Sequence, residues 1–207
     1  ELSMMNGGYF TIGTTKGLST KMSDDYMSLL YGHPFAYTSF PYIIINGEKI
    51  TLDRFFRKDI QSVESSATSL TYSVKSNEFI IEFSLAIRPT NSSLRFNYKI
   101  VNISGSNQEL GMGLFFDPEM GQGGDGQVAI NNQFISSDSI FNKTFPNDLY
   151  IYERSSNPSG LGYQLDFQSN IPDNLRIGNW ADVYGGSNRF VNQAIFDVAI
   201  DLTWGID

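Results

Sequence analysis

Repeated alternation of apolar and polar residues is the feature that most constrains the fold of this chain. It is clearest in the middle, at Leu94, Phe96, Tyr98 and Ile100. Successive side chains of a β-strand point to opposite faces, so a period of two predicts a strand with one buried face. The same pattern recurs at residues 70–75, 79–88, 110–116 and 196–204. Each one-sided strand needs a covering layer, and the sequence therefore predicts an antiparallel all-β fold.

The segment 94–126 is predicted to form one long β-hairpin that organises the rest of the chain. Its strands, 94–101 and 110–116, are separated by the polar turn Ser104-Gly105-Ser106-Asn107. The second strand ends in a glycine-rich segment with the carboxylates Asp117, Glu119 and Asp125. We expect these carboxylates to lie on a flexible loop at the far end of the hairpin.

Shorter elements are predicted on both sides of this segment. Asn46-Gly47 takes the positive φ angles of a tight turn, so residues 42–45 and 49–52 should pair as a hairpin. Residues 21–31 suit either an irregular loop or a short helix that begins at Ser23 and ends before Pro34. Further strands are predicted at residues 8–14, 127–130, 149–153, 161–167 and 175–180.

Length and composition favour one domain. The chain has 207 residues, of which 41% are apolar and 14% aromatic, and it shows no internal repeat or low-complexity linker. This is enough for a sizeable core, and β-sandwiches of this size commonly form single units. We therefore predict one large two-layer antiparallel β-sandwich over residues 1–207, with at most one or two short helices.

Charge and cysteine content exclude several classes of function. Acidic residues outnumber basic ones by 22 to 14, and a net charge of −8 repels phosphate backbones, so we expect no nucleic-acid partner. No window approaches the roughly 20 apolar residues of a membrane-spanning helix, so no membrane span is predicted. The chain has no cysteine, which excludes disulfides, thiolate metal sites and cysteine nucleophiles.

Two segments resemble a known module. Residues 13–47 contain Asp24-Asp25, Leu29-Leu30-Tyr31-Gly32 and Asn46-Gly47, and residues 96–126 contain Gly111 to Phe116 followed by Asp117, Gly121, Asp125 and Gly126. They resemble a module of bacterial secreted and cell-surface proteins with the β-supersandwich fold of the galactose-mutarotase-like, carbohydrate-binding superfamily. The resemblance implies an extracellular or cell-surface location and a sugar-related role. Related chains continue past the last strand, which implies that this chain is a fragment of a longer protein.

Catalytic chemistry has little support in the sequence. Sugar ring opening needs an acid and a base together, and the only histidine, His33, precedes a proline in a turn. No Gly-x-Ser-x-Gly motif accompanies it, and Asp117 and Glu119 are the remaining candidates for a hydrolase pair. We expect no catalytic residue and predict a non-catalytic extracellular module that binds a glycan or a surface protein. The alternative is a sugar-modifying enzyme, either an aldose mutarotase or a glycoside hydrolase.

The acidic segment and one aromatic segment are the candidate binding sites. Asp117, Glu119 and Asp125 could bind calcium through oxygen ligands, although the alternative is that Asp117 only accepts hydrogen bonds from turn amides. Their spacing matches no recognised calcium loop, so no cofactor is expected, with calcium as the alternative. Trp180, Tyr184 and Arg189 could bind a sugar through ring faces and a guanidinium fork. The competing interpretation is that Trp180 ends a strand and packs into the core, where Trp204 is also expected.

Overall fold

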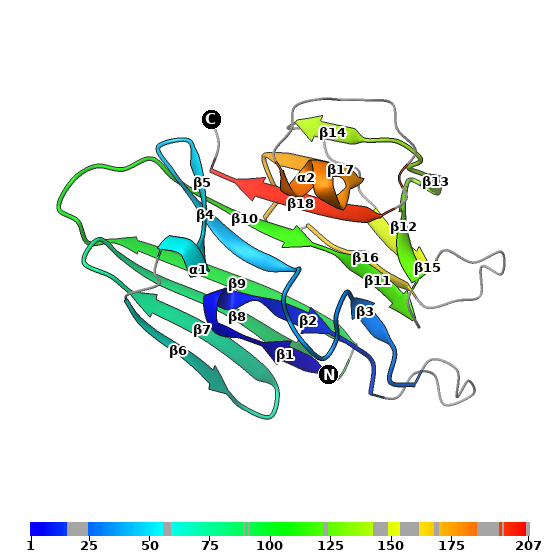
Figure 1. The fold of residues 1–207 in the computed structure, drawn as a ribbon, viewed down its shortest axis with the longest axis horizontal. Helices are drawn as coiled ribbons and strands as arrows, with labels where there is room; N and C mark the ends of the chain where they lie inside the picture. The colour runs from blue at the N-terminus through cyan, green and yellow to red at the C-terminus, as the bar shows by residue number, and fades with distance from the viewer. Residues whose placement is uncertain are drawn as a thin grey trace.

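The computed structural model describes residues 1–15, 25–55, 59–88, 90, 92–121, 124–142, 149–153, 162–167, 170–185, 195 and 197–205. Most of these residues belong to antiparallel β-sheets (Figure 1). The described part also contains a 3-10 turn, η1 (Asn6–Gly8), and two short helices, α1 (Leu52–Phe55) and α2 (Trp180–Tyr184). The predicted all-β, sandwich-like fold with few helices is confirmed for these residues.

The sheet whose described strands hold the most residues, called the largest sheet below, forms one layer of the fold. Its described strands lie in the order β14 (Ser139–Asn142), β17 (Asn174–Asn179), β18 (Val198–Trp204), β10 (Leu110–Phe116), β4 (Phe40–Ile45) and β5 (Glu48–Thr51). The register places Leu114 opposite Leu202, and Leu202 opposite Leu175, so one face of the sheet is continuously apolar. That face looks inward.

Two further sheets cover this apolar face. One has the order β6 (Ile60–Ser65), β7 (Ser69–Lys75), β8 (Phe79–Arg88) and β9 (Ser93–Asn102). The other has the order β16 (Gly162–Leu165), β15 (Leu149–Glu153), β12 (Gly124–Ile130), β11 (Pro118–Gly121) and β3 (Ser28–Leu30), with β13 (Gln133–Phe134) also paired to β12. A small pair, β1 (Leu2–Met4) and β2 (Phe10–Ile12), completes the described sheets.

The main core lies between these layers. Phe83 of β8, Phe116 of β10 and Ile151 of β15 are at most 2% exposed and belong to one cluster. The cluster also includes Phe10, whose ring makes an edge-to-face contact with Phe116. A second cluster packs Ile43 of β4 against the four-stranded sheet. Burial of alternate residues along each strand is therefore what joins the layers.

The opposite face of the largest sheet carries a buried polar contact. Gly113 has no side chain, so the ring of Tyr42 crosses β10 at this position, where a Cβ would collide with it. The Tyr42 hydroxyl donates to Asp201 Oδ1 at 2.6 Å, and Lys49 Nζ donates to Asp201 Oδ2 at 2.9 Å. Burial raises the pKa of Asp201, and Lys49 and Tyr42 oppose this increase. The glycine thus allows β4, β5 and β18 to be tied together across β10.

The prediction that residues 94–126 form one hairpin is wrong. β9 pairs with β8 along its whole length, whereas β10 pairs with β4 and β18 in a different sheet. The intervening turn is held by its own polar groups, and Asn46 binds the start of β10 through the Glu109 amide at 3.1 Å. Alternation identified both strands, but it contains no information about which strands pair.

One of the two alternatives predicted for residues 21–31 was a short helix, and this prediction is wrong for the residues of that range that the structure describes. Ser28–Leu30 is strand β3, which pairs with β11 and buries Leu30 in the core. Residues 16–24 lie outside the described part. By contrast, the tight turn at Asn46-Gly47 is confirmed, with φ angles of 49° and 83°. Among the described residues, no helix is both long and apolar enough to span a membrane.

Candidate functional site

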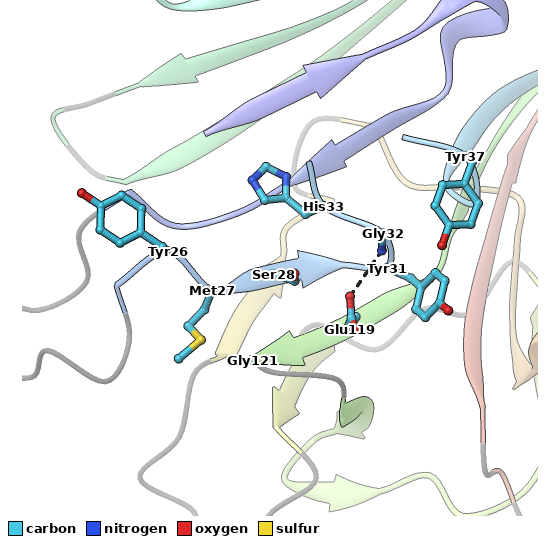
Figure 2. Close-up of a pocket in the computed structure, with 9 residues that line it drawn as sticks. All are labelled: Tyr26, Met27, Ser28, Tyr31, Gly32, His33, Tyr37, Glu119 and Gly121. Carbon is cyan, nitrogen blue, oxygen red and sulfur yellow. Dashed lines mark hydrogen bonds between the residues drawn. The ribbon is translucent and has the colours of Figure 1, made fainter. Parts of the chain in front are cut away.

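A shallow cavity of about 340 Å³, largely open to solvent, lies beside strands β3 and β11 (Figure 2). Its walls are made largely by the segment that contains β3 and the turn after it, and β11 closes one side. The lining residues are Tyr26, Met27, Ser28, Tyr31, Gly32, His33, Tyr37, Glu119 and Gly121. The exposed fractions of Tyr26, Tyr31 and Tyr37 are 73%, 43% and 53%, so aromatic surface is available to a ligand here.

The turn after β3 brings two of these tyrosines together. Gly32 has φ +82°, and a Cβ there would collide with the ring of Tyr37, so only glycine allows this close approach. The amide of Phe35 donates to the Gly32 carbonyl at 2.6 Å and closes the turn. As a result, the rings of Tyr31 and Tyr37 meet edge to face, with centroids 5.7 Å apart and an interplanar angle of 81°.

Glu119 supplies a carboxylate to the same end of the cavity. Its Oε2 accepts a hydrogen bond from the Gly32 amide at 3.3 Å, which Figure 2 shows as a dashed line. Burial raises the pKa of Glu119, hydrogen bonds from Gly32 and Ser28 oppose the increase, and Asp125 adds to it. Two tyrosine rings and one hydrogen-bonded carboxylate therefore lie together.

Asp117 holds the tyrosine-bearing turn against the sheet. Its carbonyl accepts from the Tyr31 amide at 2.8 Å, and its amide donates to Ser39 Oγ at 2.9 Å. The side chain is buried, and burial raises the pKa of Asp117 to about 7, although a hydrogen bond from Thr38 lowers it. Asp117 therefore fixes both ends of the segment that contains Tyr31 and Tyr37.

The three residues predicted to bind calcium lie on paired strands and the bend before them. Glu119 of β11 stands opposite Asp125 of β12, and Asp117 immediately precedes β11. The expectation of a flexible loop is wrong for these residues. Asp197 adds a fourth nearby charge, since it contributes to the raised pKa of Asp117. The described residues contain no cluster of three carboxylates or histidines arranged to hold a metal ion. The expectation of no cofactor, with calcium as the alternative, stays a prediction.

His33 lines the cavity but is largely used in packing. Its side chain is 8% exposed and lies against Gly13, where a Cβ would collide with the ring. Nε2 is 3.7 Å from a Glu1 carboxylate oxygen, and burial lowers the pKa of His33 despite that carboxylate. The Glu1 carboxylate is thus the acidic side chain beside His33, and the sequence supplies no second histidine to share a proton with it.

The predicted aromatic sugar site is only partly assembled. Trp180 and Tyr184 lie on α2 and stack at 4.8 Å with an interplanar angle of 11°. Both rings also contact Phe115 edge to face, so they cover the outer face of the largest sheet. Arg189 lies outside the described residues. Trp180 thus follows strand β17 and packs on the sheet, while Trp204 is partly buried against the main core.

The cavity lined by Tyr26, Tyr31 and Tyr37, called the tyrosine cavity from here on, was not predicted from the sequence. The available signal was the density of aromatic residues near glycine and proline between residues 26 and 37, where no alternation is present. No protein-family model matches the chain, and comparison with curated proteins gives no match either. The functional interpretation therefore depends on the geometry of the cavity.

Proposed function

We propose that this chain is a non-catalytic, extracellular carbohydrate-binding module and that the tyrosine cavity binds a sugar ring. The observation that supports this most strongly is the corner formed by Tyr31, Tyr37 and Glu119. The C–H face of a sugar packs well on an aromatic ring, while a carboxylate accepts hydrogen bonds from hydroxyl groups. The resemblance to a carbohydrate-binding superfamily supports both the ligand class and the location.

The size and polarity of the cavity favour a small polar ligand over a protein surface. Small-molecule sites commonly occupy roughly 300–1,000 Å³, and this cavity falls at the lower end of that range. Protein interfaces instead use a broad apolar centre. Figure 2 shows Tyr26 and Met27 at one end of the cavity and Tyr31 and Tyr37 at the other, an arrangement that suits consecutive sugar units.

A sugar-modifying enzyme is the second candidate. One observation favours it: burial raises the pKa of two neighbouring carboxyl groups, to about 7 at Asp117 and in the same direction at Glu119. Asp117 is only 5% exposed, is hydrogen-bonded to Thr38, and does not line the cavity. The binding function therefore ranks first.

Calorimetric titration with trisaccharides of glucose, galactose, glucosamine and N-acetylglucosamine tests the binding proposal. At least one should bind, and Tyr37→Ala should weaken that binding about tenfold or more, because an aromatic ring that the ligand covers contributes strongly to affinity. Phe134→Ala is the matched control, since Phe134 is 57% exposed on β13 of the same sheet and does not line the cavity. An equal loss of affinity in Tyr37→Ala and Phe134→Ala, or no binding of any trisaccharide by the wild type, would contradict the proposal.

A further inference from the structure

The charge of the residues that line the cavity narrows the class of ligand further than the shape of the cavity does. Glu119 is a carboxylate, and Asp125 stands opposite it on β12. His33 adds no positive charge near neutral pH, because burial lowers its pKa. Among the lining residues that the structure describes, none is a lysine or an arginine. The described wall therefore offers aromatic rings and negative charge together.

This combination suits a positively charged group. Ammonium groups are attracted to the faces of tyrosine rings, and this attraction is strongest where the rings are partly desolvated. The rings of Tyr31 and Tyr37 meet at 81°, so a group in the corner between them can approach the faces of both rings. Glu119 lies beside the corner and retains acceptor capacity, because a carboxylate accepts about four hydrogen bonds.

We infer that the tyrosine cavity selects an amino sugar, with the protonated amine of a glucosamine unit beside Glu119 and the tyrosine corner. The inference rests on the proposed sugar-binding function and adds the class of sugar. Acetylation of the amine removes the charge while keeping the ring and its hydroxyls. The charge can therefore be tested separately from sugar binding.

The experiment compares the glucosamine trisaccharide with the N-acetylglucosamine trisaccharide by calorimetric titration of the whole chain. We expect the charged sugar to bind at least about tenfold more tightly, and we expect added salt to reduce only that difference. Glu119→Gln should bring the two affinities to within about threefold. Glu82→Gln, an exposed carboxylate paired with Lys99 on another sheet, should leave the ratio unchanged.

The outcomes separate the inference from the proposed function. Equal affinity for both trisaccharides, with a loss of affinity in Tyr37→Ala, would overturn the amine inference and would still support the sugar site. Binding of neither would overturn both. A lysine tripeptide that binds as tightly as the glucosamine trisaccharide would also overturn the inference, because the sugar ring would then contribute nothing. Should Glu119→Gln fail to fold, the salt dependence of the wild-type ratio decides: a salt-independent ratio contradicts the inference.

Discussion

Two of the groups of surface aromatic residues in the described part of the molecule differ in what surrounds them. Tyr184 and Tyr37 are similarly exposed, at 49% and 53%. Tyr184 stacks on Trp180 and contacts Phe115, so its ring covers an apolar sheet face. Tyr37 instead contacts Tyr31 in a cavity that also holds Glu119. Exposure alone thus does not mark a binding site, and the neighbouring groups decide whether a ring stabilises the fold or is available to a ligand.

The largest expected effect tests the structural role of the α2 region. Phe115 is 0% exposed and contacts Phe40, Trp180 and Tyr184. Phe115→Ala should lower the free energy of unfolding by about 3–5 kcal/mol, because it leaves a cavity under α2. Urea denaturation measures the change, with Phe134→Ala as the exposed control. A loss below about 1 kcal/mol would mean that this aromatic group does not support the sheet.

The second prediction concerns the support of the tyrosine cavity. Asp117 has a pKa of about 7 in the fold against an ordinary value of 3.8, so the folded chain holds a proton that the unfolded chain releases. The contribution of Asp117 to the free energy of unfolding is therefore fully present below about pH 4 and is lost as the pH rises through 7. The loss amounts to roughly 4 kcal/mol at most, since each pKa unit is worth about 1.4 kcal/mol.

Asp117→Asn should remove that part of the pH dependence, because the amide stays neutral. Its free energy of unfolding should exceed that of the wild type at pH 8 and approach it at pH 4. Urea titrations at several pH values measure this, with Glu82→Gln as a control that should follow the wild type. A pH dependence unchanged in Asp117→Asn would show that another group is responsible.

These expectations also show why the strands were predictable and the site was not. Alternation depends on a local rule, and it located β8, β10 and β18 closely. The partner of a strand depends on residues distant in sequence, which is why β9 and β10 were wrongly paired. The cavity likewise needs Asp117 to bind the amide of Tyr31, 86 positions away. Glu119 and Asp125 could be grouped from the sequence because they are only six positions apart.

The smallest effect is expected from calcium. The Asp117 carboxyl group already accepts a hydrogen bond from Thr38, so we expect the thermal midpoint to stay nearly unchanged in excess calcium. A ligand at a hundred times its dissociation constant would add about 2.7 kcal/mol. On a domain of this size that would raise the midpoint by roughly 5–11 °C. Melting curves with calcium or chelator measure this, and a shift that disappears in Asp125→Asn would establish a metal site.

Mapping of amide chemical shifts during titration with the glucosamine and N-acetylglucosamine trisaccharides tests the central claim most directly. We expect the amides of Tyr31, Gly32 and Glu119 to shift with ligand concentration, while those of Trp180 and Tyr184 stay in place. Shifts centred on Trp180 and Tyr184, with the Gly32 amide unaffected, would contradict that claim and make the α2 region the binding surface.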